Sequence, residues 1–304
     1  MNTPQKTHPQ KFAHAAGFTL IEIAMVILII GLLAVGATSI TTQVLQKQRR
    51  DTTVARLAAV ESAINLFVAQ NKFLPCPAIG SLDGTAAIPD ARLGREQVNV
   101  GRAGCNLTNQ QSGIVPWVTL GLSVADVQDG WNNMLTYRVE ESLVRTSSMD
   151  FTMCSPAGTS AAVGAAPNLT CQTPCTTATF PGACTDPKLV TTGRGLRVKA
   201  ASGAIVANPS ITPSTGAAYA VISHGENQAG AYQFDGILNA GTIASGTQEA
   251  VNHADQPYPA NSATAYLVDD VATYTDTTAH FDDFVLRGSI LSVATKAQLG
   301  PRAY

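Results

Sequence analysis

One short segment has the residue types of a hydrolase site. Ser223-His224-Gly225 follows an apolar run that is typical of a strand. Some hydrolases present a serine nucleophile on a turn after a strand, but that turn has a glycine two residues before the serine. Here this position is Val221, and the similarity ends there. We therefore expect no enzyme, and we interpret His224 as a loop-end residue that binds backbone groups.

A long acidic segment offers oxygen ligands. Between Lys199 and Arg287 there is no lysine or arginine, yet nine acidic residues are present. Such carboxylates either stay solvated or bind hard cations. The candidates for calcium are two adjacent pairs, namely Asp269, Asp270, Asp282 and Asp283. The spacing of an EF-hand is absent, so solvated loops are the alternative, and we expect no obligatory cofactor.

Six cysteines form the third candidate set. An even number in an exported domain predicts three disulfides. Cys76 and Cys105 stand apart from the rest, so we expect them to pair around an early loop. The other four are expected to close the loop at 155–187 among themselves: Cys154, Cys171, Cys175 and Cys184. A zinc site is the alternative, although no Cys-x-x-Cys pair is present.

The composition excludes several classes of protein. Of 304 residues, 13% are charged, whereas an average soluble domain carries roughly 25%. The net charge of −2 excludes a generally basic nucleic-acid binder. The hydrophobic fraction of 45% excludes a disordered chain.

An uncharged run from Ile23 to Gln46 is long enough to cross a bilayer as a helix. A cleaved signal peptide is the alternative, with Lys6 and Lys11 as its basic start and Ala34-Val35-Gly36 as its cleavage site. Glu22 argues against it, because it stands at the front of the run. A carboxylate in a bilayer costs on the order of 3 kcal/mol and usually marks function.

The segment Gly17-Phe18-Thr19-Leu20-Ile21-Glu22 resembles the processing site of type IV pilins and of the pseudopilins of type II secretion. The resemblance implies cleavage between Gly17 and Phe18 by a prepilin peptidase, N-methylation of Phe18, and a role of Glu22 in assembly. The new amine and the carboxylate are each costly near hydrocarbon, and pairing lowers that cost. The pair can form between subunits or within one helix. The resemblance covers residues 1–71, and the rest only loosely.

The same resemblance implies partners and a location. The partners are the prepilin peptidase, other pilin or pseudopilin subunits, and an assembly platform with its ATPase. The chain would cross the inner membrane once, with its N-terminus in the cytoplasm and its C-terminal domain in the periplasm, before it enters a filament or reaches the cell surface. No direct contact with nucleic acid is expected. Major pseudopilins hold calcium in a C-terminal loop, which supports calcium at the acidic pairs.

We expect an α+β fold in which a long N-terminal helix packs on an antiparallel sheet with long, disulfide-closed loops. The expected parts are a leader (1–17), a transmembrane and assembly helix (18–46), its amphipathic extension (47–71) and a globular domain (72–304). Apolar residues of the extension recur at three- and four-residue steps: Val54, Leu57, Val60, Ile64, Phe67 and Val68. Strands are expected at 135–139, 151–154, 195–200, 218–223 and 284–291.

The stretch from Asp129 to Tyr137 resembles the Asp-x-Trp-Gly-Asn-x-x-x-Tyr sequence that begins the sheet in major pseudopilins, with Asn132 in place of the usual glycine. We expect a turn that leads into a strand, with Trp131 and Tyr137 as core anchors and Trp117 packed nearby.

These observations favour a structural subunit of a type IV pilus or a type II secretion pseudopilus. The size of the globular domain favours a minor subunit over the repeating major one. The alternative is a membrane-anchored or secreted binding domain, such as an adhesin, that does not polymerise.

Overall fold

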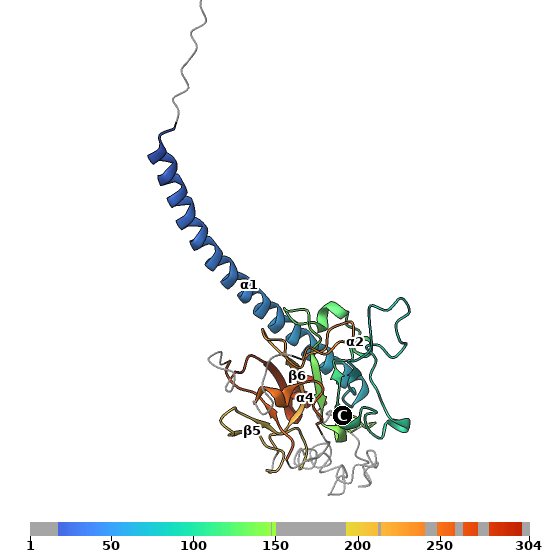
Figure 1. The fold of residues 1–304 in the computed structure, drawn as a ribbon. Helices are drawn as coiled ribbons and strands as arrows, with labels where there is room; N and C mark the ends of the chain where they lie inside the picture. The colour runs from blue at the N-terminus through green and yellow to red at the C-terminus, as the bar shows by residue number, and fades with distance from the viewer. Residues whose placement is uncertain are drawn as a thin grey trace, which may run out of the picture. The chain divides into compact units, whose positions relative to one another are not determined.

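The structure is a computed structural model that describes residues 18–146, 148–149, 193–211, 214–240, 248–258, 264–272 and 280–299, without the side chains of 32–41. The chain divides into two compact units, Met1–Gln48 and Arg49–Tyr304. Helix α1 (Leu20–Asn71) has residues in both units (Figure 1). The strand expected at 151–154 and four of the cysteines lie outside the described residues: Cys154, Cys171, Cys175 and Cys184.

One helix in the described part of the chain is long and apolar enough to cross a membrane, namely the Thr42–Asn71 portion of α1. The Leu20–Gly31 portion is apolar but shorter. A core helix of a soluble protein meets the same criterion of length and composition, so the burial of the side chains decides its role.

One stripe of α1 is buried in the core of the second unit. Its residues recur at three- and four-residue steps: Thr53, Leu57, Val60, Ile64 and Val68. The predicted stripe is wrong at Val54, which is 55% exposed. Phe67 is only half-buried and packs edge-on against Phe73, with ring centroids 5.7 Å apart. Since each buried aliphatic side chain contributes about 1.5–3 kcal/mol, the stripe from Thr53 to Val68 belongs to the protein core, whereas most of the Thr42–Asn71 portion is not buried.

The buried stripe packs on a five-stranded antiparallel sheet. This confirms the expected α+β class and the expected packing of the helix on an antiparallel sheet. The strands, in spatial order, are β1 (Ala78–Ile79), β2 (Gly113–Ile114), β3 (Thr136–Val139), β6 (Ala217–Ser223) and β8 (Phe284–Ser289). The strands expected at 135–139 and 218–223 correspond to β3 and β6.

Strand β6 is buried on both of its faces. Tyr219 and Val221 belong to the core that includes α1, whereas Ala220 and Ile222 belong to a second core. The second core also contains residues from all strands of a smaller sheet, in the order β5 (Ile205–Ala207), β4 (Val198–Lys199) and β7 (Leu267–Val268). Here β4 pairs antiparallel with β5 and parallel with β7, and only two residues of the strand expected at 195–200 form β4.

Strand β3 is also buried on both faces, so its predicted half-exposure is wrong. The prediction fails at Arg138, because its charged side chain is buried inside the protein instead of facing solvent. Burial lowers the pKa of Arg138 to about 10. Its guanidinium donates hydrogen bonds to four backbone carbonyls, those of Gln110, His253, Ala254 and Gln256.

The strand expected at 284–291 ends earlier, because Ser289 caps a helix. Its hydroxyl accepts a hydrogen bond from the backbone N–H of Ser292 (3.2 Å), and helix α4 (Ile290–Lys296) follows. Ser is among the preferred residues at this capping position. The remaining described helical segments are short: α2 (Trp117–Leu120) and the 3-10 turns η1 (Val100–Arg102), η2 (Thr108–Gln110), η3 (Val124–Val127), η4 (Glu141–Leu143) and η5 (Glu249–Asn252).

A turn leads into β3, as expected, and is organised by Asp129. Its carboxylate accepts hydrogen bonds from the backbone N–H groups of Trp131 and Asn133, both at 2.9 Å. Asn132 has φ 67°, a left-handed conformation that asparagine tolerates better than most residues, which explains why it can replace glycine here.

The aromatic anchors of this region are buried. Trp131 lies against Phe284, with ring centroids 6.1 Å apart, and Tyr137 against Tyr219, at 6.2 Å. Both expected anchors are confirmed. The ring contact of Trp117 is with Phe234 (6.5 Å).

The same turn binds to α1 through backbone groups. Arg56 donates hydrogen bonds to the carbonyls of Gln128 and Asp129, and the N–H of Gly130 donates to the hydroxyl of Thr53, all at 2.9 Å. This bond explains why Thr53, and not Val54, occupies the buried stripe. A Cβ atom on Gly130 would overlap the carbonyl of Arg49, so glycine is required for the close approach.

Gly130→Ala is therefore expected to destabilise the second unit by about 1–3 kcal/mol, because the added methyl group would force the backbone at residue 130 or at Arg49 to move. Urea unfolding of the full chain in detergent, followed by tryptophan fluorescence, measures the change. Gly31→Ala is the matched control, since a Cβ there meets nothing within 4 Å. Equal unfolding midpoints for both variants would contradict the proposed close contact.

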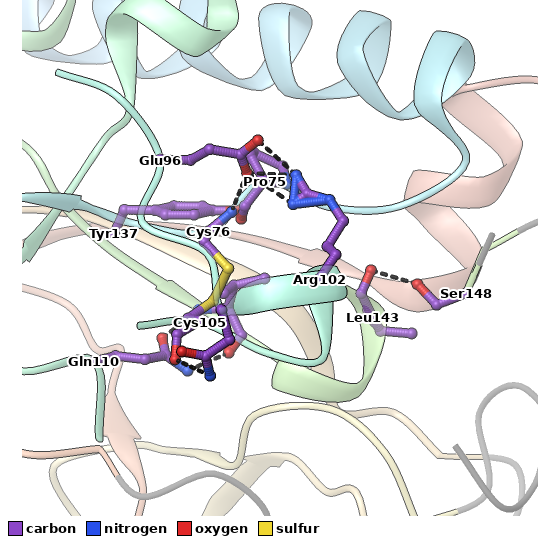
Figure 2. The surroundings of a disulfide bond; sticks show 11 residues. Pro75, Cys76, Glu96, Arg102, Cys105, Gln110, Tyr137, Leu143 and Ser148 are labelled. Atoms are coloured by element: carbon purple, nitrogen blue, oxygen red, sulfur yellow. Dashed lines mark hydrogen bonds and ion pairs between the residues drawn. A yellow bond between two sulfur atoms is a disulfide. The ribbon is translucent and has the colours of Figure 1, made fainter. Parts of the chain in front are cut away.

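The disulfide between Cys76 and Cys105 confirms one of the three expected pairs, with Cα atoms 5.5 Å apart (Figure 2). Glu96 lies beside it: its carboxylate accepts a hydrogen bond from the N–H of Cys76 (3.0 Å) and forms an ion pair with Arg102 (2.6 Å). The hydroxyl of Tyr137 donates to the carbonyl of Pro75 (3.2 Å). The segment that joins the end of α1 to the disulfide is thus held to β3 through Tyr137.

The double variant Cys76→Ala/Cys105→Ala is expected to lose about 3–4 kcal/mol of the free energy of unfolding, since the bond closes a loop with a sequence separation of 29. Urea unfolding with and without reductant tests this. Reductant should destabilise the natural chain much more than the double variant. If reductant lowers the free energy of unfolding of the natural chain and of the double variant equally, the effect of reduction must come from other cysteines.

Candidate functional site

The N-terminal end of α1 is organised by Thr19 and Glu22. The backbone N–H of Thr19 donates to the Glu22 carboxylate (3.0 Å), and the N–H of Glu22 donates to the Thr19 hydroxyl (3.3 Å). The Thr19 hydroxyl also donates to Glu22 (3.0 Å). These reciprocal bonds form a capping box, which satisfies two backbone donors that a helix start leaves free. Glu22 therefore has a local structural role that the sequence analysis missed, although the Thr-x-x-Glu spacing signals it.

Phe18 precedes this cap and is 82% exposed, whereas Gly17 lies outside the described residues. The Glu22 carboxylate is exposed as well, and it has lone pairs to spare for a further donor. An added positive group near this end of the helix can therefore pair with Glu22 without breaking the cap.

Phe18 and the first turns of α1 present an apolar surface. The exposed large side chains are Phe18, Leu20, Ile21, Ile23, Met25, Val26, Ile27, Leu28, Ile29 and Ile30. Soluble proteins rarely expose a continuous apolar surface of this extent, so it requires lipid or protein as a neighbour.

The four aspartates proposed for calcium fall into two groups. Asp269 forms an ion pair with Arg287 (2.7 Å), and Asp270 accepts a hydrogen bond from the N–H of Ala201 (2.6 Å). Both therefore have partners within the protein. Asp282 and Asp283 are instead buried.

Asp282 lies with Glu249 and His280 in a cluster whose ligand atoms are all within 4.8 Å of one another. Glu249 begins η5, and the other two residues directly precede β8. Asp283 adjoins the cluster, with one carboxylate oxygen 3.7 Å from Nδ1 of His224. Nothing in the local sequence links Glu249 to the aspartates, because the fold alone brings η5 to the start of β8.

The electrostatics of the cluster are unfavourable for three charged carboxylates. Burial raises the pKa of Glu249, and the neighbouring Asp282 and Asp283 raise it further. Burial likewise raises the pKa of Asp283. His224 does not compensate, because burial lowers its pKa to about 3 and keeps the ring neutral at physiological pH.

The Ser223-His224 segment is buried beside this cluster. The hydroxyl of Ser223 donates to the carboxylate of Asp129 (2.8 Å), and Nε2 of His224 is 2.8 Å from the hydroxyl of Thr136. The two side chains thus have different partners, so they do not form a serine–histidine pair. The ring of His224 contacts a side chain where a backbone group was expected.

The described residues thus offer two candidate sites. One is the capped, apolar start of α1, whose chemistry is helix packing and charge pairing. The other is a buried cluster of carboxylates and an imidazole, which are the kinds of side chain that bind metal ions. Comparison of the chain with family models, curated proteins and solved structures gives no match.

Proposed function

We propose that this chain is a structural subunit, and a minor one, of a type IV pilus or a type II secretion pseudopilus. The observation that carries the proposal is the Gly17–Glu22 segment, which directly precedes an uncharged apolar helix. In this proposal prepilin peptidase cleaves between Gly17 and Phe18 and methylates the amine of Phe18. The chain has no catalytic role.

The surface of the helix supports this function. Residues 18–46 would cross the inner membrane once, with the N-terminus in the cytoplasm, because the exposed apolar side chains from Phe18 to Ile30 suit a lipid environment. During assembly by the platform and its ATPase, neighbouring subunits would replace the lipid around the same side chains. The globular domain would lie in the periplasm, an oxidising compartment that suits the Cys76–Cys105 disulfide.

Glu22 would serve two purposes in this scheme. Within the subunit it caps α1 together with Thr19. Between subunits its charge would attract the amine of a neighbouring Phe18, and the pair would be strong in a medium of low dielectric constant. The size of the domain from 72 to 304 supports a minor position in the filament.

Mass spectrometry of the mature chain tests the processing step. The expected N-terminus is Phe18 with one added methyl group. A start near Ala37 would instead identify an ordinary signal peptide, and an uncleaved chain would support the alternative of a membrane-anchored binding domain.

Two substitutions at Glu22 separate the charge from the cap. Glu22→Gln keeps an oxygen that can accept the hydrogen bond from Thr19 but removes the charge, whereas Glu22→Ala removes both. If the charge drives assembly, both variants are processed normally, yet both reduce filament incorporation about tenfold or more, as measured by immunoblotting of sheared filaments. This threshold corresponds to roughly 1.4 kcal/mol of lost pairing.

Asp51→Asn is the matched control, because Asp51 is an exposed acid on the same helix. It should assemble normally. Normal incorporation of Glu22→Gln together with failure of Glu22→Ala would show that capping alone matters. Normal incorporation of both variants would refute an assembly role for Glu22.

A further inference from the structure

We propose that Glu249, His280 and Asp282 bind one divalent transition-metal ion of the zinc class, with Asp283 adjacent to it. This site goes beyond the proposed function, which needs no metal.

The positions of the ligand atoms fit such an ion. In a tetrahedral zinc site with bonds of about 2.1 Å, the ligand atoms are roughly 3.4 Å apart. The three ligand atoms here lie within 4.8 Å of one another, so a small inward movement of side chains brings them to that spacing. Three protein ligands leave the fourth position for water or for Asp283.

Buried oxygen atoms without partners provide the independent observation. One oxygen each of Glu249, Asp282 and Asp283 is buried and has no hydrogen-bond donor among the described residues. The three residues are at most 6% exposed. Two carboxylates that face each other offer only acceptors, so the missing group must supply positive charge or protons.

No lysine or arginine supplies that charge within the part of the chain that the structure describes. The basic side chains found there within 4.0 Å of Asp282 and Asp283 are both histidines, His280 at 3.6 Å from Asp282 and His224 at 3.7 Å from Asp283. A single divalent cation bound between the buried carboxylates would neutralise their charge.

The second oxygen of two ligands is already held by the protein. One oxygen of Asp282 accepts hydrogen bonds from the N–H groups of Glu226 (2.7 Å) and Asn227 (2.9 Å). The side chain of Asn227 donates to Glu249 (2.7 Å). Such bonds orient metal ligands and leave the opposite oxygen free for the ion. A Cβ on Gly225 would overlap Asp282, so the glycine lets the 224–227 loop reach the cluster.

The type of ligand favours a transition metal over calcium. Calcium takes six to eight oxygen ligands, whereas imidazole together with carboxylates suits zinc and its neighbours. A groove of about 420 Å³ between α1 and β8 has Asp282 and Asp283 among its lining residues.

The test uses the full chain in detergent, treated with EDTA and dialysed. One equivalent of Zn²⁺ is added, and bound metal is measured by elemental analysis after gel filtration. We expect about one Zn²⁺ per chain and a melting temperature at least about 3 °C higher than that of the metal-free chain. The same amount of Ca²⁺ should give neither.

Two variants locate the site. Glu249→Gln and His280→Ala should each weaken Zn²⁺ binding more than about tenfold and abolish the thermal shift. Metal-free Glu249→Gln should be no less stable than the natural chain, because the neutral amide can donate a hydrogen bond to the neighbouring carboxylates. His280 is partly exposed, so its replacement provides a second variant if the first fails to fold. Asp235→Asn, in the same acidic segment, is the matched control and should bind normally.

Three outcomes would overturn the proposal. The first is the absence of bound Zn²⁺ in the natural chain, which would leave shared protons to satisfy the carboxylates. The second is undiminished Zn²⁺ binding by both site variants, which would place the ion at other ligands. The third is Ca²⁺ binding that equals Zn²⁺ binding and is lost in the same variants. Such binding would show that the imidazole of His280 does not make the site prefer Zn²⁺ over Ca²⁺.

Discussion

Strand β6 must be apolar on both faces, and the architecture of the second unit depends on this constraint. One face packs under the buried stripe of α1, and the other packs on the smaller sheet. Small residues at Ala218 and Ala220 let neighbouring elements approach closely on each side. A shift in register between Ala217 and Tyr219 lets the strand supply both cores near its start. Because a continuous apolar strand has no solvent face, it needs a layer on each side, and α1 and the smaller sheet supply these two layers.

Complete burial has consequences for polar residues on β3, which lies next to β6. Arg138 is enclosed, and its two terminal nitrogens donate hydrogen bonds to carbonyl groups of loops that would otherwise need water. The loop after β6 likewise places His224 in a neutral, buried position. Hydrogen bonds on this face therefore determine where the long loops lie, because each unsatisfied buried group would cost about 1–3 kcal/mol.

The first part of α1 has a different physical character. Its large apolar side chains from Leu20 to Ile30 are exposed, and its first turn is organised by the cap that Thr19 and Glu22 form. The stability of this part comes from the hydrogen bonds of its own helical backbone and from contacts with the lipid or protein around it. In the proposed filament subunit this division is useful, since one unit folds around its own core and the other keeps its apolar surface for lipid or for other subunits.

The sequence by itself determined the features that depend on local pattern. Periodicity located the helix stripe and strands β3 and β6, and the isolation of Cys76 and Cys105 indicated their pairing. The tertiary structure alone decided which polar residues are enclosed. Arg138 looks like a solvent-facing residue of an alternating strand, but the loops that carry Gln110 and His253–Gln256 enclose it. Thr53 replaces Val54 in the stripe because a distant turn offers it a hydrogen bond. Glu249 meets Asp282 only because η5 lies against the start of β8. These contacts join residues far apart in the chain, and their energy depends on geometry that no local spacing encodes.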